Sequence, residues 1–214
     1  MSTPWPSRRP QTLPTPRKPI ADVYDAAYTG VPNWDIGRPQ RAFVFLEEEG
    51  LVESPVLDVG CGTGELALFL AGRGYRVLGI DLSSLAIRQA KAKAQWRRTP
   101  AKFLVWDALD LVGLAERGLT FATVADCALF HILGDRERDR FVDGLETVLR
   151  PDGLYCVLGD ARRDPRDVYG VSPAELRERF AEGWTVEFVY ETTFERRYSA
   201  NPAYFAGIRR TART

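Results

Sequence analysis

Nine residues, LDVGCGTGE at 57–65, constrain the fold more than any other part of the chain. The run begins with apolar residues and then places glycines at alternate positions, Gly60, Gly62 and Gly64. Glycine adopts positive φ angles easily and leaves bare backbone that a ligand can approach closely. An apolar helical pattern starts directly afterwards at Leu66. The sequence therefore predicts a buried strand, a tight turn and a helix N-terminus, with a ligand lying against the turn.

Acidic residues accompany the first three expected strands. Asp58 lies inside the nine-residue run, Asp81 ends the next apolar run, and Asp107 follows the third. An acid at the second position accepts hydrogen bonds from a ribose diol, and one at the third accepts from the amino group of adenine. We expect Leu82 and Trp106 to flank the adenine ring. One such acid is commonly a turn former, so the repetition at three strand ends is what indicates a nucleoside ligand.

Two other glycine turns compete with this interpretation. A dinucleotide-binding turn reads G-x-G-x-x-G, whereas Glu65 stands here in the place of the third glycine. A Walker A loop ends in Gly-Lys-Ser or Gly-Lys-Thr, and neither follows this turn. An acid at the turn repels a pyrophosphate and suits a positively charged ligand. A nicotinamide-dependent enzyme and an ordinary strand–helix turn without a ligand are the alternatives.

Composition limits the classes of function. The 214 residues suffice for one domain, and 29 basic against 29 acidic side chains give no net charge that would attract nucleic acid. No apolar run reaches the ~20 residues that cross a bilayer, and the N-terminus lacks the apolar core of a signal peptide. Cys61, Cys127 and Cys156 are expected to be reduced thiols, and a single histidine argues against a zinc site. We expect a cytoplasmic protein without a metal, membrane or nucleic-acid partner; the oligomeric state is open, with a monomer favoured.

The first twenty residues differ from the rest of the chain. Residues 1–20 contain six of the fourteen prolines, four basic residues and no acid. This composition predicts a disordered basic tail, followed by one folded domain over residues 21–214. The tail is interpreted as a solvated extension, with a docking peptide as the alternative.

From residue 21 onward, helical and strand patterns alternate. Alternation of this kind predicts a parallel sheet covered by helices on both faces. Two consecutive strands at the C-terminus break the pattern and indicate one antiparallel strand. The fold class is therefore α/β, a Rossmann-like, seven-stranded and mostly parallel sheet with an antiparallel C-terminal strand. The expected strands are 55–59, 75–80, 101–106, 121–127, 154–158, 185–193 and 204–210, and the expected helices are 21–28, 40–49, 65–73, 83–96, 135–149 and 173–180.

These motifs resemble those of the class I S-adenosylmethionine (SAM)-dependent methyltransferases. LDVGCGTGE is similar to their motif I, LGIDLS to their ribose-binding turn, and VLRPDGLY to a segment that usually reads LRPGG, with Asp152 in place of a glycine. The loop PNWDIGRPQ at 32–40 resembles the PWDxGxPxP segment of the thiopurine and thiol methyltransferases. The resemblance implies SAM as cofactor, S-adenosylhomocysteine as product, and Trp34, Asp35 and Arg38 at the cofactor mouth. The expected cofactor-binding residues are Tyr28, Trp34, Arg38, Asp58, Gly60, Cys61, Gly62, Gly64, Asp81, Leu82, Asp107, Ala108, Asp126 and Cys127.

Fewer residues suggest how a methyl acceptor would be handled. DCALFHIL resembles the family's D-x-x-x-x-H segment after the fourth strand, which makes His131 the candidate general base, with a structural histidine as the alternative. Asp160 and Arg162 or Arg163 stand where a loop often touches the substrate, and they are candidates for steering a substrate carboxylate. The catalytic candidates are thus His131, Asp160 and Arg162.

The acceptor itself is inferred from chemistry. The fourth-strand segment lacks the (N/D/S)-P-P-(Y/F/W) sequence common in nucleic-acid methyltransferases, so a small molecule is favoured. A thiol ionises near neutral pH and needs no strong base, which makes S-methylation in metabolite tailoring or detoxification the first hypothesis. The alternatives are an O- or N-methyltransferase of a secondary metabolite, with His131 as base, and a SAM-binding scaffold without turnover.

Overall fold

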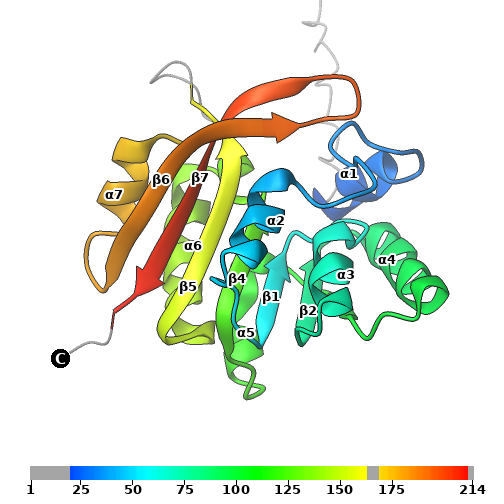
Figure 1. Cartoon of the computed structure of the whole chain (residues 1–214), viewed down its shortest axis with the longest axis horizontal. Helices are drawn as coiled ribbons and strands as arrows, with labels where there is room; N and C mark the ends of the chain where they lie inside the picture. The colour runs from blue at the N-terminus through cyan, green and yellow to red at the C-terminus, as the bar shows by residue number, and fades with distance from the viewer. Residues whose placement is uncertain (1–19, 163–168, 212–214) are drawn as a thin grey trace, which may run out of the picture.

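The structure is a computed structural model that describes residues 20–162 and 169–211. Its centre is a seven-stranded sheet in the order β3-β2-β1-β4-β5-β7-β6 (Figure 1). The first five strands run parallel, and β7 runs antiparallel to both of its neighbours. The expected fold class is confirmed. The strands are β1 (Val56–Val59), β2 (Val77–Asp81), β3 (Lys102–Val105), β4 (Phe121–Cys127), β5 (Leu149–Asp160), β6 (Trp184–Glu195) and β7 (Ala200–Arg210).

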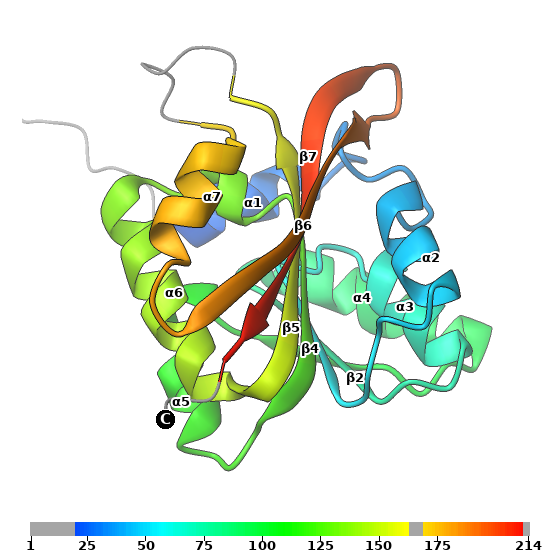
Figure 2. The same cartoon turned by 60° about the vertical axis from the view of Figure 1, so that its left-hand side comes forward.

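Helices cover both faces of this sheet. With the sheet seen nearly edge-on, α2, α3 and α4 lie on one side and α5, α6 and α7 on the other (Figure 2). Parallel strands cannot be joined by a tight turn, and the long crossover between them is usually a helix. The helices are α1 (Ile20–Ala27), α2 (Arg41–Glu48), α3 (Glu65–Gly72), α4 (Ser84–Arg97), α5 (Leu111–Ala115), α6 (Asp135–Val148) and α7 (Pro173–Arg179), with 3₁₀ turns η1 (Ala108–Asp110) and η2 (Phe130–Ile132).

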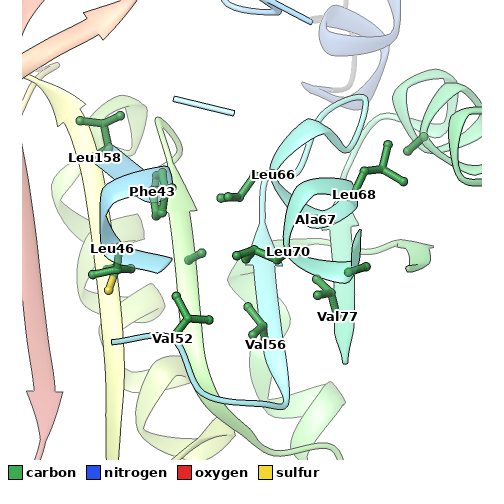
Figure 3. Close-up of a cluster of buried hydrophobic side chains, with 14 of the residues drawn as sticks. Phe43, Leu46, Val52, Val56, Leu66, Ala67, Leu68, Leu70, Val77 and Leu158 are labelled. Atoms are coloured by element: carbon green, nitrogen blue, oxygen red, sulfur yellow. The ribbon is translucent and has the colours of Figure 1, made fainter. Parts of the chain in front are cut away.

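Each face of the sheet has its own apolar core. Figure 3 shows the first core, where Phe43 and Leu46 of α2 and Leu70 of α3 pack over Val56 of β1. The second core contains Phe130, Phe141, Tyr155 and Phe180 among its buried residues and lies under α5, α6 and α7. Because both faces are buried, the central strands read as continuous apolar runs rather than as alternating ones.

The C-terminal strands are longer than expected. The sequence indicated a fifth strand over 154–158, but β5 spans Leu149–Asp160 and passes through Asp152, whose φ is +59°. The polar residues of 149–153 hide this extension, because they lie outside the apolar core. The boundaries of the expected helices agree to within two residues, α5 was not expected as a helix, and Ser83 and Ser172 cap α4 and α7.

The tip of the long β6–β7 hairpin contacts the N-terminal segment of the described chain. It arches over the carboxyl edge of the sheet toward α1 and the loop that precedes α2 (Figure 1). Gln40 of that loop donates from Nε2 to the Glu195 carbonyl (2.8 Å) and accepts from the Glu195 N–H (3.0 Å). Arg197 donates its backbone N–H to the Asn33 carbonyl (2.8 Å). The loop and the hairpin tip therefore form one rim above the strand ends.

Two further expectations concern the N-terminal tail and the absence of a membrane-spanning segment. The predicted tail over residues 1–20 lies outside the described residues except for Ile20, so the proposed domain boundary stays a prediction. Within residues 20–162 and 169–211, no helix is both long and apolar enough to cross a membrane.

Candidate active site

The glycine turn after β1 has the conformation that its sequence predicts. Gly60, Gly62 and Gly64 all have positive φ angles, of 65°, 52° and 85°. A Cβ atom at Gly60 would lie 3.1 Å from Cβ of Leu129, and one at Gly62 would lie 2.8 Å from the hydroxyl of Tyr28. Side chains are therefore excluded by backbone strain and by close neighbours. The bare turn is covered by Tyr28 on one side and by the loop after β4 on the other.

Asp58 lies beneath this turn with one acceptor atom unfilled. Its Oδ2 accepts the Ala67 N–H (3.0 Å), whereas Oδ1 is buried and has no hydrogen-bond partner. Burial, and secondarily the nearby Asp126 and Asp81, raises the pKa of Asp58 to about 8. A buried carboxylate without a counter-charge is costly, and a cationic ligand group would both pair with it and favour its ionised form. The ammonium of an amino acid moiety fits this position.

Asp81 ends β2 and turns back toward the glycine loop. Its Oδ2 accepts the Gly62 N–H (2.8 Å) and its Oδ1 accepts the Ser83 N–H (2.7 Å). Burial raises its pKa above the ordinary value. A carboxylate has about four lone-pair sites, so each oxygen keeps room for one hydroxyl donor. The position agrees with the expected binding of a ribose diol.

The segment before α2 closes over the glycine turn. Tyr28 is buried, its hydroxyl accepts from Trp34 Nε1 (3.1 Å), and burial raises its pKa. Asp35 accepts from the Thr63 hydroxyl (2.6 Å), which ties the same segment to the turn. The Trp34 ring remains partly exposed. Tyr28 and Trp34 therefore lie beside the glycine turn, and their contact with the cofactor stays a prediction.

Two charged residues expected to face the cofactor are paired elsewhere. Glu65 accepts from Lys93 Nζ (2.6 Å) and from both terminal nitrogens of Arg97, so its interpretation as part of a cation site is wrong. Arg38 forms a two-pronged ion pair with Glu195 (2.8 and 3.0 Å) on the hairpin rim. Its guanidinium links the loop before α2 to the β6–β7 hairpin. Its contact with the cofactor stays a prediction.

The ends of β3 and η1 form a more open edge. Asp107 is exposed, and its Oδ1 accepts the Leu109 N–H (2.8 Å). Trp106 donates from Nε1 to the Asp110 carbonyl, and the Arg117 guanidinium lies 4.7 Å from its ring centre. One face of the Trp106 ring is thus occupied by an arginine. Leu82 and Ala108, expected to line the same edge, are partly exposed there.

Asp126 has a structural role that its position at a strand end does not reveal. It is fully buried, and its carboxylate accepts the N–H groups of Leu129 and Phe130 and the hydroxyl of Tyr155. Burial raises its pKa to about 7. Because its side chain holds the loop after β4, we correct the expectation that this carboxylate faces a ligand. Next to it, Ala128 has a φ of +71°, so strained backbone marks the strand end.

Cys61 lies in the glycine turn after β1, and Cys127 is the last residue of β4. Both thiols are partly buried, and burial raises the pKa of each well above its ordinary value. Neither is a nucleophile at neutral pH, because the thiolate is the reactive form. Their expected contact with the cofactor stays a prediction.

His131 lies in a buried polar cluster after β4. Its Nδ1 accepts the backbone N–H of Asp160 (2.9 Å), and its ring meets Phe194 edge-on at 6.1 Å. The Asp160 carboxylate accepts from Arg196 (2.6 Å) and from the Asn201 amide (3.2 Å). Asp160 Oδ1 and Arg196 Nε are both buried, and neither has a hydrogen-bond partner among the residues that the structure describes. The cluster therefore offers one unfilled acceptor and one unfilled donor beside the imidazole.

A buried arginine fixes the backbone around that cluster. Arg138 of α6 is fully buried and donates to the carbonyls of Leu133, His131 and Gly170, and it pairs with Glu175. Arg162, a catalytic candidate, instead pairs with Glu175 at 2.7 Å. Its Nε has no partner among the described residues, and its expected role in binding a substrate carboxylate stays a prediction. Arg163, named as its alternative, lies outside the described residues.

A cleft of about 380 Å³ opens at the rim formed by the loop and the hairpin. Arg196 belongs to both this cleft and the His131 cluster, so the cleft leads toward the candidate acceptor region. Sequence reasoning missed Arg138, Arg196 and Gln40, because each acts through a partner that is distant in the chain. Nothing in the charged run around Arg138 distinguishes it from a solvated face. The cleft is lined by Ile36, Arg38, Glu195, Arg196, Arg197, Ser199 and Ala200.

Comparison with known proteins completes these observations. A family model described as a methyltransferase domain matches residues 56–153. A 2-heptyl-1-hydroxyquinolin-4(1H)-one methyltransferase of Mycobacteroides abscessus is 35% identical over 181 residues, which cover 78% of each protein. A solved structure described as "Conversion of a Disulfide Bond into a Thioacetal Group during Echinomycin Biosynthesis" is 36% identical, with a TM-score of 0.80, over 91% of this chain and 94% of that one.

A more distant solved structure shares the fold alone. It is the 1,6-didemethyltoxoflavin-N1-methyltransferase of Burkholderia thailandensis with bound S-adenosylhomocysteine, 20% identical with a TM-score of 0.70. The alignment covers 94% of this chain and 93% of that one. The seven-stranded architecture thus persists where little sequence identity remains.

Proposed function

Because this chain belongs to the class I SAM-dependent methyltransferases, we propose that it methylates a sulfur atom of a small organic molecule. The enzyme class, the SAM cofactor and a small-molecule acceptor follow from the family. The choice of sulfur is the proposal. One observation carries it: among the described residues of the polar cluster, His131, the candidate general base, already uses its Nδ1 to accept the Asp160 N–H.

We propose specific contacts for the cofactor. The unfilled Oδ1 of Asp58 takes the ammonium group, and the glycine turn lies against the methionine end. Asp81 takes the ribose diol through its remaining lone pairs, and Asp107 with Leu82 and Ala108 borders the adenine. SAM supplies a methyl group already activated by its positively charged sulfur. The protein contributes alignment and a site shielded from water, which together lower the barrier by several kcal/mol.

Sulfur is favoured by intrinsic reactivity and by one relative. A thiolate is a strong nucleophile and forms at a pH near neutrality, so its methylation requires little from the protein. The related structure at 36% identity is described by sulfur chemistry, the conversion of a disulfide into a thioacetal. This relationship supports a soft acceptor in the present chain. The resemblance of residues 32–40 to the thiol methyltransferases has the same implication.

A second candidate acceptor is the oxygen of an N-hydroxy heteroaromatic ring. The M. abscessus relative is named for such a compound, a 1-hydroxyquinolin-4-one. The cleft at the hairpin rim offers a route for a flat molecule to the His131 cluster, with Arg196 at their junction. An acidic N-hydroxyl shares the essential property of a thiol, because it ionises without strong base catalysis.

The experiment that tests this proposal measures transfer of labelled methyl from SAM. The acceptor panel contains aryl thiols, alkyl thiols, N-hydroxyquinolones, phenols and amines, and cofactor binding is measured separately by calorimetry. Methylation of thiols at the highest kcat/KM is the expected result. Preference for the N-hydroxyquinolones would select the second candidate. SAM binding without transfer to any compound would contradict both.

A further inference from the structure

We propose that the methyl acceptor is ionised before it reaches this site, and that His131 positions it as a neutral hydrogen-bond donor rather than removing its proton. The inference rests on the proposed function and narrows it to acceptors that exist as anions near neutral pH. It covers thiols and N-hydroxy heteroaromatics, and it excludes aliphatic alcohols. The two ring nitrogens of His131 have different roles.

The tautomer of His131 follows from its hydrogen bond to the main chain. The backbone N–H of Asp160 can only donate, so the Nδ1 atom that accepts it at 2.9 Å carries a lone pair. A neutral imidazole then has its proton on Nε2. A general base at Nε2 needs the opposite tautomer, with the proton on Nδ1 and a carbonyl or carboxylate to receive it. The ring is therefore fixed in the form that donates from Nε2.

The surroundings of His131 reinforce this state. Burial lowers the pKa of His131 to about 4. Among charged groups that face the ring, Asp160 of β5 favours the imidazolium, whereas Arg196 beyond β6 and Arg138 of α6 oppose it. The carbonyl of Ala128 also favours the charged form. The two arginines and the burial outweigh these influences, so the ring stays neutral at physiological pH.

Other described side chains near the cluster do not replace His131 as a base. Asp160 is paired with Arg196 and Asn201, and Glu175 with Arg138, Arg162 and Arg179. The Asp126 carboxylate accepts hydrogen bonds from three donors, which are the N–H groups of Leu129 and Phe130 and the hydroxyl of Tyr155. Asp160 keeps one oxygen, Oδ1, without a partner among the described residues, but proton uptake there would remove the negative charge that pairs with Arg196. Proton uptake by Glu175 would likewise remove the charge that pairs with Arg138, and proton uptake by Asp126 would disturb the loop after β4.

An anionic acceptor resolves this lack of a base. The acceptor loses its proton to solvent before binding, and its lone pair then forms the bond to the methyl carbon. The carbon–sulfur bond of the cofactor breaks with its electron pair going to the sulfur, and no proton moves in that step. Arg196, whose Nε is buried without a partner, supplies a positive group for the anion. The unfilled Asp160 Oδ1 suits an N–H or O–H elsewhere on the acceptor.

The tautomer can be tested directly, because the chain contains a single histidine. The full-length protein labelled with ¹⁵N-histidine is titrated from pH 5 to 9, alone and with S-adenosylhomocysteine. We expect the nitrogen shifts of an Nε2–H tautomer that does not titrate in this range. An Nδ1–H tautomer, or protonation near pH 6.5, would overturn the proposal without reference to any substrate.

Kinetics provide the second test. The pH dependence of kcat/KM is compared for 4-nitrothiophenol, 2-mercaptoethanol, an N-hydroxyquinolone and benzyl alcohol. We expect the rate to rise to a plateau at the pKa of each acceptor, so that the break point moves with the acceptor. A break at one pH for all acceptors, or turnover of benzyl alcohol comparable to the thiols, would overturn the proposal.

A matched substitution separates positioning from proton transfer. His131→Asn keeps an oxygen near the Nδ1 position to accept the Asp160 N–H, but it cannot act as a base, whereas His131→Ala removes the acceptor too. We expect the asparagine variant to retain kcat within about tenfold with an unchanged pH profile, and the alanine variant to lose more. Loss of 100-fold or more in the asparagine variant, with its profile flattened, would indicate a general base.

The outcomes also separate this inference from the proposed function. Binding of SAM with no methylation of the anionic probes would overturn the acceptor class. Failure of SAM to bind would instead contradict the proposed function.

Discussion

The site edge of the sheet is built in different ways on its two sides, at the carboxyl ends of β1 to β3 and at those of β4 and β5 with the β6–β7 turn. On the first side the contacts of the two acids span at most 19 residues: Asp58 accepts from Ala67 nine residues away, and Asp81 accepts from Ser83 two residues away and from Gly62 nineteen residues away. On the second side they are long: 29 residues separate His131 from Asp160, 36 separate Arg196 from Asp160, and 155 separate Gln40 from Glu195.

This difference suggests that cofactor binding depends on the β1–β3 edge and that acceptor use depends on the β4–β7 edge. The β1–β3 edge is a preformed turn with an unfilled carboxylate oxygen, and it suits a ligand that all members of the family share. The β4–β7 edge is a network in which long-range ion pairs fix loops that a family can vary. Substitutions on the two edges should therefore have separable effects, on cofactor binding in one case and on acceptor use in the other.

The largest expected effect comes from the network that holds the acceptor edge. Arg138→Met leaves Glu175 and three backbone carbonyls without their buried donor, so we expect the free energy of unfolding to fall by about 3–5 kcal/mol. Urea denaturation measures this loss. Arg140→Met, on the exposed face of the same helix, is the control and should change stability little. Equal stability of the two variants would refute the proposed role of the network.

The second prediction concerns the glycine turn of the cofactor edge. Gly62→Val places a β-branched side chain at a φ of +52° and against the Tyr28 hydroxyl, and we expect SAM affinity to fall by about 100-fold, roughly 3 kcal/mol. Titration calorimetry measures the affinity. Gly30→Ala is the matched control, because a Cβ atom there meets nothing within 4 Å. Normal SAM binding by the valine variant would show that the turn does not hold the cofactor.

A third prediction uses the raised pKa of Asp58. Without ligand this pKa is about 8, so Asp58 is largely protonated at pH 7, and a bound cationic group should lower the pKa and release about one proton. At pH 9.5 the carboxyl is already ionised, so the release should disappear. Calorimetry in buffers of different ionisation enthalpy counts the protons.

The isosteric variant Asp58→Asn tests whether that proton belongs to Asp58. It should bind SAM more weakly and release fewer protons at pH 7 than the unsubstituted protein. An identical proton count would assign the release to another group and would leave the unfilled Oδ1 without a role in binding.

The smallest effect is expected at the rim that joins the two edges. Arg38→Met removes an exposed ion pair with Glu195, so stability should fall by less than about 1 kcal/mol. Because Arg38 also lines the cleft, the KM for the acceptor should rise up to about fivefold, while SAM affinity stays the same. Steady-state kinetics with each substrate varied in turn measures both. A larger change in SAM affinity than in acceptor KM would instead support the contact between Arg38 and the cofactor that the sequence predicts.

Particular residues show how far sequence reasoning extended. The glycine turn, Asp81 and the antiparallel strand were predicted, because each depends on a local pattern or on strand order. Asp126 was misjudged, since an acid at a strand end looks the same whether it faces a ligand or caps a loop. Glu65 was misjudged because Lys93 and Arg97 approach it from a different helix.

The sequence alone determined the class of fold and the conformation of the glycine turn after β1. Periodicity and glycine spacing act over a few residues, where backbone sterics leave few alternatives. Only the tertiary structure decided which charged groups are neutralised, which His131 nitrogen accepts the Asp160 N–H and which oxygen of Asp58 has no partner among the described residues. These properties depend on burial and on partners brought together from distant parts of the chain, and such contacts leave no pattern in a single sequence.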